Sequence, residues 1–279
     1  MNGLLIVNKN KDMTSRDVVN IISKKFNTKK VGHTGTLDPI ATGVLVILIG
    51  KYTKLVDILT SNTKEYIATM KLGIHTDTLD ITGNIINKKD YNIDEKQIKE
   101  VLKSFIGESI QEVPKYSAIK INGKKLYEYA RENIDIELPK RNIVIYDIEL
   151  LEYKNDLIKF RVVVSKGTYI RSLIRDIASR LNTYACMSDL KRTKQGNFDI
   201  SSSYTLDDIK NDNYKLLTYK DIFKDYKKYE LNDDEYFKVK NGQQMKLNIN
   251  EEQIIFIYQS NYIALYEKYN DTYKIKIMF

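Results

Sequence analysis

Apolar residues in the first part of the chain recur with the periods of short strands and an amphipathic helix. An apolar run at residues 3–8 predicts a strand, and the continuous run Val44–Ile49 predicts a buried strand. Alternation of apolar and polar positions predicts a further strand at Lys64–Leu72. Between the first two strands, Thr14 or Ser15 is placed to cap a helix.

Two later helices have clear start signals. Asp94 and Gln97 form a capping-box pair before an apolar face, and Gly107 is expected to close that helix. The second helix has the clearest pattern in the chain, and Thr168 is expected to cap it. Its apolar positions form one continuous stripe at helical spacing: Ile170, Leu173, Ile174, Ile177, Ala178 and Leu181.

The remaining strands fall into two groups. Residues 142–153 and 157–165 predict two long strands joined by a turn. After about residue 225 the pattern changes to short strands separated by polar turns, at 253–258, 262–266 and 273–278. We therefore expect a larger α+β domain at residues 1–225 and a small all-β domain at residues 226–279.

Composition narrows the class of protein. Of the 279 residues, 42% are hydrophobic and 29% are charged, which allows a sizeable core and a charged surface. The single cysteine, Cys186, excludes an intrachain disulfide. The apolar stretches near the N-terminus and at Val44–Ile49 are too short for a signal peptide or a membrane span. We expect a cytoplasmic, monomeric protein with no metal and no membrane partner.

The charge balance suits a polyanionic partner. The 45 basic and 37 acidic residues give a formal charge of +8, which would attract the phosphates of a nucleic acid. Residues 1–60 carry nine Lys and Arg against four Asp, and residues 115–125 combine four lysines with a tyrosine. A simpler explanation stays open, because an AT-rich genome also yields abundant Lys, Asn, Ile and Tyr, and a basic surface can simply be solvated.

The loop at residues 32–43, with the sequence GHTGTLDPIATG, is the densest candidate for a functional site. Pro39 disfavours helical angles at Asp38, so this carboxylate is held in an extended or turn conformation. Glycines in the loop let the backbone approach a ligand closely. Asp38 can then serve as a nucleophile or general base, or it can cap an amide of an ordinary Asp-Pro turn.

Arg171 is unusual for a different reason. It lies in the first turn of the predicted helix, where the helix dipole disfavours cations, and Arg175 repeats the charge one turn later. Such an arginine can pair with a carboxylate or a phosphate, or stay solvated. The two histidines, His33 and His75, have no partners at metal-ligand spacing, so no metal site is expected.

Taken together, these residues resemble the TruB family of tRNA pseudouridine synthases, which isomerise uridine 55 in the T loop of tRNA. The resemblance is spread over residues 1–200, and the C-terminal segment resembles the family's small PUA-like domain. The blocks that carry it are GHTGTLDPIATGVL at 32–45, KEYIATMKLGIHTDTLDITG at 64–83, PKYSAIKINGKKLYEYAR at 114–131, SKGTYIRSLIRDIA at 165–178 and LKRTKQGNF at 190–198.

The resemblance implies a pseudouridine synthase fold with a mixed, largely antiparallel central sheet, no cofactor, and the T-arm stem-loop of tRNA as partner. It places the nucleophilic aspartate at Asp38, with attack on C6 or on C1′ left open. Arg171 would keep that carboxylate ionised. Aromatic faces would receive a base flipped out of its loop. The substrate-binding residues implied are Tyr66, Tyr169, Arg171, Leu190 and His33.

The chain departs from the family pattern in two places, and two other functions stay open. The family's usual proline and glycine are absent from Lys9–Ser15, which predicts a more mobile loop before the first helix. Val113 stands where a second proline is expected, and both departures affect the shape expected for the loops around the RNA groove. One alternative is an RNA chaperone that grips the T arm without catalysis. The other is a synthase that depends on a guide RNA.

Overall fold

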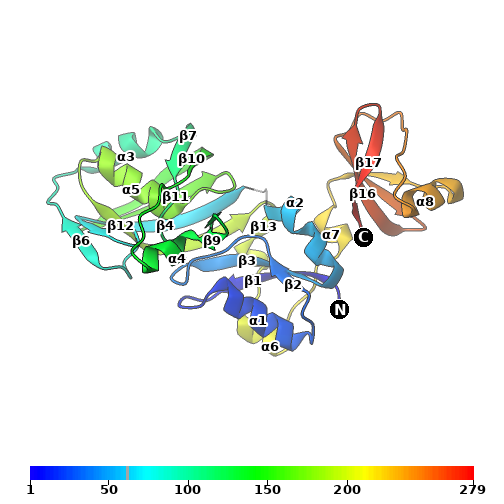
Figure 1. Ribbon diagram of the computed structural model, residues 1–279, viewed down its shortest axis with the longest axis horizontal. Coiled ribbons are helices and arrows are strands. Elements are labelled where there is room, and N and C mark those ends of the chain that lie inside the picture. Colours follow the sequence, from blue (N-terminus) through cyan, green and yellow to red (C-terminus); the bar gives the residue numbers. More distant parts are fainter. Residues whose placement is uncertain (61–62) are drawn as a thin grey trace.

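The computed structural model describes residues 1–60 and 63–279. Its main feature is a nine-stranded sheet, counted over these residues, that runs through the larger part of the molecule (Figure 1). All pairings in it are antiparallel except that between β3 and β12, which confirms a mixed, largely antiparallel sheet. The strand order is β1 (Gly3–Lys9), β3 (Thr42–Ile49), β12 (Ala185–Gln195), β4 (Lys64–Leu72), β11 (Leu157–Val164), β10 (Lys140–Lys154) and β7 (Gly107–Glu112), with β2 (Val31–His33) on β3 and β13 (Phe198–Asp199) on β12.

The helices cover the sheet because each strand sends alternate side chains to opposite faces. Leu5 and Val7 of β1 join a core cluster with residues of several helices, whereas Leu4 and Ile6 join a second cluster. The first cluster contains side chains of α1 (Ser15–Lys25), α3 (Glu95–Lys103), α5 (Ile170–Arg180) and α6 (Leu206–Lys210). The second contains side chains of α2 (Val56–Thr60), α7 (Tyr219–Ile222) and the C-terminal strands.

Two predicted helix boundaries are wrong, although both helices are present. The capping box of Asp94 and Gln97 starts α3 as predicted, but α3 ends at Lys103, and Gly107 begins β7 instead. Tyr169, not Thr168, is the N-cap of α5. The hydroxyl of Thr168 donates to the carbonyl of Ser165, so it closes the turn that leaves β11.

Strand β12 lies in the centre of the sheet, yet the hydrophobic pattern did not predict it. Register shifts between Met187 and Asp189 and between Arg192 and Lys194 interrupt its alternation. Charged residues also fall on its buried positions: Arg192 is 1% exposed. The short hairpin of β5 (Ile74–Thr76) and β6 (Ile85–Lys88) was not predicted either.

The C-terminal part is a separate four-stranded sheet with its own core (Figure 1). The three predicted strands are confirmed as β15 (Gln253–Tyr258), β16 (Asn261–Tyr269) and β17 (Thr272–Met278), and β14 (Lys227–Glu230) pairs in parallel with β15. Helix α8 (Asp233–Lys240) also belongs here, so this module is not purely β. Its sequence, DDEYFKVK, lacks an apolar stripe. The division at residue 226 stays a prediction.

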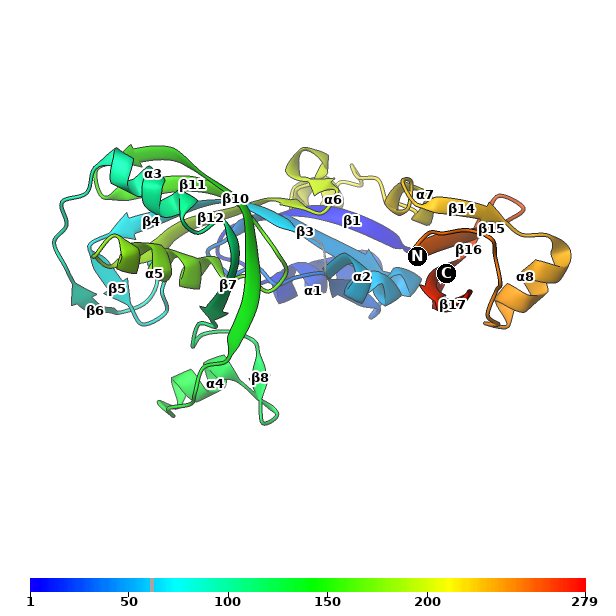
Figure 2. The same cartoon turned by 90° about the horizontal axis from the view of Figure 1, so that it is seen from above.

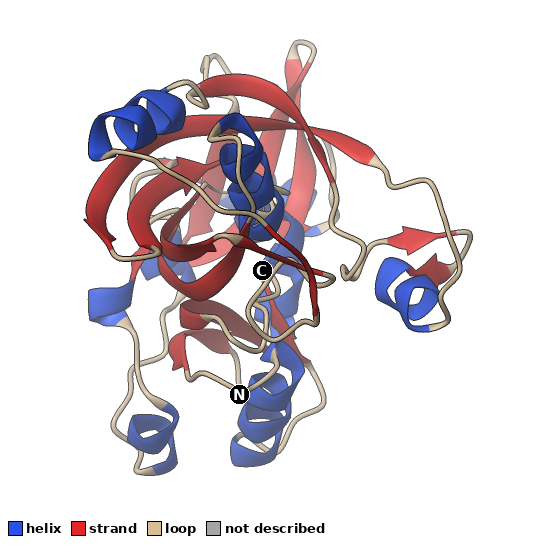
Figure 3. Ribbon diagram, turned by 90° about the vertical axis from the view of Figure 1, so that its left-hand side faces the viewer, coloured by secondary structure: helices blue, strands red, loops and turns tan. Residues whose placement is uncertain are grey.

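Residues 113–139 form an arm that projects from the end of β7 and returns at the start of β10 (Figures 2 and 3). The arm consists of a two-stranded hairpin, β8 (Lys120–Ile121) and β9 (Lys124–Lys125), and the short helix α4 (Leu126–Arg131). Leu126 of the arm is buried, and its N–H donates to the carbonyl of Ile119 at 2.8 Å. The four lysines at residues 115–125 therefore stand away from the main sheet.

Candidate active site

The loop that carries Asp38 is fastened on both sides of the aspartate. The N–H of Ala41 donates to the carbonyl of Asp38 at 3.0 Å, which closes a turn over Pro39. On the other side, Ser15 at the start of α1 exchanges two hydrogen bonds with the backbone of Leu37, at 2.9 and 3.3 Å. The backbone at Asp38 is therefore fixed by contacts that leave its carboxylate free for another partner.

A buried lysine supports the same loop. Lys9 donates to the carbonyls of Asn10, Met13 and Pro39 at 2.8, 2.6 and 3.2 Å. Burial lowers the pKa of Lys9 to about 8, and the nearby charge of Asp38 opposes that shift. Asp12 adopts a left-handed φ of 60°, so the turn forms without the family's glycine. The increased mobility expected of this segment stays a prediction.

Arg171 binds the carboxylate of Asp38 through two nitrogen atoms. Its Nε lies 2.9 Å from Oδ2 and its Nη2 lies 3.1 Å from Oδ1. The remaining donors are directed to the carbonyls of Thr78 and Tyr116, at 3.0 and 2.9 Å. The arginine side chain is 6% exposed, while that of Asp38 is 31% exposed. The carboxylate thus pairs with a buried cation instead of a local amide, and it stays open to solvent.

A second carboxylate, Asp80, stands behind the arginine. Its Oδ2 lies 3.9 Å from Nη1 of Arg171, and its side chain is 9% exposed. Its Oδ1 accepts from the hydroxyls of Thr78 and Thr82, at 2.9 and 2.5 Å. Sequence reasoning missed Asp80, although it lies in the quoted block at residues 64–83. The signal that could have indicated Asp80 is the polar cluster TDTLD at residues 76–80, which interrupts a block otherwise typical of a strand.

Three of the other predicted residues lie in the main core or at the start of α5. Tyr66 on β4 is 8% exposed, Leu190 on β12 is 5% exposed, and both belong to the core cluster that includes the residues flanking Asp38. Tyr169 is the residue before α5, two positions from Arg171. Burial raises the pKa of the Tyr169 hydroxyl against the opposing charges of Arg141 and Arg171. This hydroxyl is therefore protonated at neutral pH and available as a donor.

His33 lies beside the loop, at the end of β2. Burial lowers its pKa, and the positive charges of Arg192 and Arg16 lower it further. The ring is therefore neutral at pH 7, and its Nδ1 accepts from the N–H of Gly35 at 3.3 Å. The hydrogen bond of the His33 ring is therefore made to the backbone of the loop and not to Asp38.

Arg192 of β12 holds the loop at residues 32–43 through hydrogen bonds to backbone carbonyls. Its Nε donates to the carbonyl of Val44 and its Nη2 to that of Gly35, at 2.7 and 3.0 Å. Gly43 is required by this strand, because a Cβ there would lie 2.2 Å from the carbonyl oxygen of Arg192. The close approach allowed by Gly43 therefore serves β12 and not a ligand.

Cations from separate elements border the site. The charge of Arg16, at the start of α1, lowers the pKa of His33. The same charge acts on Lys125 of the arm, where it opposes the rise in pKa caused by the hydrogen bond from Lys125 to Tyr127. Arg141 of β10 acts on Tyr169. Positive charges thus act on the residues around the half-buried carboxylate of Asp38.

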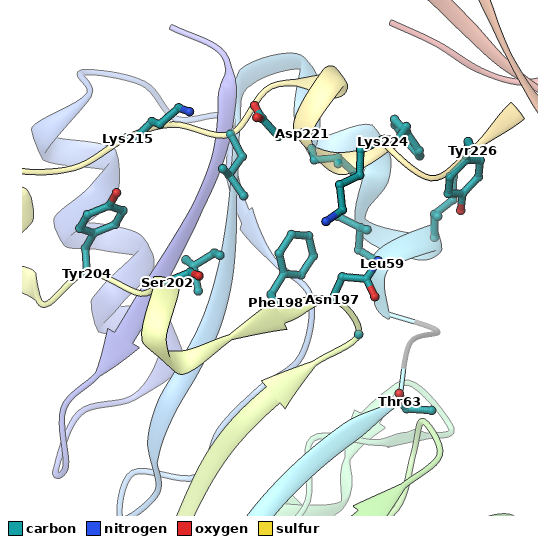
Figure 4. Close-up of a pocket in the computed structure, with 16 residues that line it drawn as sticks. Leu59, Thr63, Asn197, Phe198, Ser202, Tyr204, Lys215, Asp221, Lys224 and Tyr226 are labelled. Carbon is teal, nitrogen blue, oxygen red and sulfur yellow. The ribbon is translucent and has the colours of Figure 1, made fainter. Parts of the chain in front are cut away.

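A cavity of about 820 Å³ lies elsewhere, between the main sheet and the segment that leads to the C-terminal module (Figure 4). Phe198 and Tyr204 line it together with Lys224, and Asp38 and Arg171 do not. Among residues 1–60 and 63–279, no three His, Cys, Asp or Glu residues gather in a group suited to a metal ion. No helix in these two stretches is long and apolar enough to span a membrane.

Comparison with known proteins places the chain among RNA-modifying enzymes. Residues 23–170 match the family model of the N-terminal domain of TruB family pseudouridylate synthases, and residues 171–224 match that of the tRNA pseudouridylate synthase B C-terminal domain. A tRNA pseudouridine synthase B from Clostridium tetani is 44% identical over 99% of this chain and 98% of its own. One from Caldicellulosiruptor saccharolyticus is 51% identical over 76% of this chain and 74% of its own.

Solved structures agree with the sequence relatives. A chain of an H/ACA ribonucleoprotein bound to a substrate RNA containing 2′-deoxyuridine superposes with a TM-score of 0.73 at 26% identity, over 99% of this chain and 84% of that chain. A chain of a Cbf5–Nop10–Gar1 complex gives a TM-score of 0.74 at 26% identity, with the same coverage. The fold and both family models lead to one conclusion: the chain belongs to the TruB family of pseudouridylate synthases.

Proposed function

We propose that this protein isomerises uridine 55 in the T loop of tRNA to pseudouridine, with Asp38 as the nucleophile. The observation that carries the proposal is the bidentate pair in which the buried Arg171 holds the partly exposed carboxylate of Asp38. Full-length relatives named tRNA pseudouridine synthase B support tRNA as the substrate. A cytoplasmic monomer would suffice for this reaction, because both members of the pair belong to one chain.

The reaction must break the glycosidic bond, turn the uracil and join its C5 to the sugar. We assign Asp38 to capture the base at C6 or the sugar at C1′ during this exchange, so that the fragment stays bound. Arg171 holds the carboxylate ionised and oriented before attack. On the C1′ route C5 displaces the Asp38 carboxylate as the carbon–carbon bond forms, and on the C6 route Asp38 is eliminated with its electron pair after that bond has formed. On either route C5 then loses a proton and N1, whose bond to the sugar has broken, gains one, so that the product is an isomer of the substrate.

The surrounding residues fit the handling of a flipped base. We assign Tyr66 to stack on the uracil, with Leu190 as an apolar wall and Tyr169 as a donor beside Arg171. His33 would contact the T arm next to the extruded nucleotide. The lysines of the projecting arm, residues 113–139, together with Arg16 and Arg141, would bind phosphates without reading sequence.

The first test is tritium release from a T-arm stem-loop labelled at C5 of its uridines. We expect release by the wild type and a loss of about 10,000-fold or more for Asp38→Asn, because removal of a nucleophile leaves only binding and positioning. Affinity for the stem-loop should change only several-fold. Asp57→Asn, an exposed aspartate on α2, is the matched control.

Three other outcomes would redirect the assignment. Turnover retained by Asp38→Asn would refute Asp38 as the nucleophile. Binding of the stem-loop without release by either protein would favour an RNA chaperone. Release that required an added guide RNA would favour the guide-dependent type. The stand-alone enzyme is supported by sequence identity, which is 26% to the two H/ACA chains and 42–44% to two tRNA pseudouridine synthase B relatives that match over almost their full length.

A further inference from the structure

The edge strand β7 has one fully buried side chain, and that side chain is polar. Gln111 is 3% exposed, whereas the three residues before it, 108–110, are all exposed. A primary amide is costly to bury unless its donor and acceptor are both satisfied. The position therefore uses the amide for hydrogen bonding and not for apolar packing.

Both hydrogen bonds of Gln111 go to the backbone of a single residue, Tyr169. The Oε1 atom accepts from the Tyr169 N–H at 2.8 Å, and Nε2 donates to the Tyr169 carbonyl at 3.1 Å. That carbonyl also accepts from the N–H of Leu173, at 3.0 Å, within the first turn of α5. Because the side chain of the N-cap Tyr169 makes no capping bond, the amide of Gln111 fixes this end of the helix from outside.

The start of α5 is also where the site meets the helix. Tyr169 and Arg171 both come from this turn, and Arg171 reaches Asp38 with two short contacts. The neighbouring residue Glu112 holds α5 further along, through Ser172 at 2.8 Å and Arg175 at 2.9 Å. Among the described residues, Gln111 is the side chain of β7 that bonds to residue 169 itself.

We propose that Gln111 is a positioning residue for the isomerisation proposed above, and the inference rests on that function. Through the backbone of Tyr169, it sets where Tyr169 and Arg171 meet Asp38 and the target uracil. The side-chain amide of Gln111 is hydrogen-bonded to the backbone of Tyr169 and not to Asp38 or Arg171. Loss of its bonds lets the first turn of α5 shift, and a displacement of about 1 Å at a reacting pair can lower the rate by about 100-fold.

The test compares Gln111→Leu, Gln111→Glu and the control Ser109→Ala, which alters an exposed residue of the same strand. The leucine removes both hydrogen bonds at similar volume. The glutamate keeps an acceptor for the Tyr169 N–H but loses the donor to its carbonyl. Each protein is assayed for the single-turnover rate with saturating T-arm stem-loop, for stem-loop affinity and for the midpoint of thermal unfolding.

We expect the rate to fall about 10- to 100-fold for Gln111→Leu and less for Gln111→Glu, with affinity within about threefold of wild type and Ser109→Ala unchanged. A structural role alone would lower the midpoint and the affinity together, without a selective effect on the rate. Three results overturn the proposal: rates within threefold of wild type in folded variants, parallel losses of rate and affinity, or failure of both variants to fold. An inactive wild type would instead refute the proposed function.

Discussion

Two arginines, Arg161 and Arg171, differ in burial and in the number of carboxylates that they contact. Arg161 on β11 is 27% exposed and is surrounded by three carboxylates, those of Glu65, Asp147 and Glu149. Arg171 on α5 is 6% exposed and shares two short contacts with one carboxylate, that of Asp38. The charge of Arg161 is neutralised at the surface, where ion pairs contribute little. Only the second arrangement holds an accessible carboxylate against a buried cation.

The two arginines differ because their guanidinium groups have different hydrogen-bond and ion-pair partners. Around Arg161 the carboxylates outnumber the cation, and those of Asp147 and Glu149 are solvated, so the guanidinium is shared among several carboxylates. Around Arg171 the backbone carbonyls of Thr78 and Tyr116 satisfy the other donors, which leaves one defined edge for Asp38. Burial of the arginine and exposure of the aspartate together distinguish a candidate catalytic pair from a surface ion pair.

Substitution of the two arginines tests the comparison most strongly. We expect Arg171→Ala to lower the single-turnover rate by about 100- to 1,000-fold, because the orientation and ionic stabilisation of Asp38 are lost. RNA affinity should change much less. Arg161→Ala should change the rate less than about threefold and the unfolding free energy by about 1 kcal/mol or less. Equal effects of the two substitutions on the rate would remove the distinction.

Exposed cations should act on binding instead of chemistry. The double variant Lys120→Ser, Lys125→Ser in the arm should weaken stem-loop binding about tenfold and make its dependence on log salt shallower by about 1.5, because two phosphate contacts are lost. The saturated single-turnover rate should stay near wild type. Lys96→Ser with Lys103→Ser, on the exposed face of α3, removes the same charge as a control. A rate defect at saturation would show that the arm also shapes the site.

The smallest expected effect concerns the pH dependence of stability. Burial lowers the pKa values of Lys9 and Lys64 to about 8, below the ordinary 10.5, so the unfolded chain binds more protons than the folded one between pH 8 and 10. The two lysines should raise the free energy of unfolding over this window by about 2 kcal/mol each. The buried thiol of Cys186, whose pKa burial raises to about 11, should offset about 1 kcal/mol of that rise. Above pH 10 the trend should reverse, since burial raises the pKa of Tyr219 and Tyr266 to about 12.

Denaturant unfolding of Lys9→Met at several pH values checks this prediction. The rise between pH 8 and 10 should be less than half that of the wild type, because only the shifted Lys64 remains and Cys186 still opposes it. Lys103→Met, which changes an exposed lysine of α3, should keep the full rise. A slope unchanged in Lys9→Met would show that Lys9 does not titrate in this window.

Prediction from sequence worked where a residue's environment is decided by its near neighbours. The strand at Lys64–Leu72 was predicted with its observed bounds because alternation alone defines it. The cap of α5 was misplaced by one residue, since Tyr169 is held by Gln111, a residue 58 positions away along the chain. Strand β12 was missed because bulges and buried charges hide its period.

The sequence by itself determined the family, through the blocks that it shares with it, and the helices α1, α3 and α5 together with the strands whose apolar pattern is regular. It also singled out Asp38, which Pro39 holds in a turn, and Arg171, a cation in the first turn of a helix. Local sterics and periodicity are enough for these elements and these two residues, because they act over a few residues. The tertiary structure decided that Arg171 pairs with Asp38, that Asp80 stands behind them, and that Lys9, Gln111 and Arg192 support the site. These contacts join segments distant in the chain, and their energies depend on burial, which exists only once the sheet has assembled.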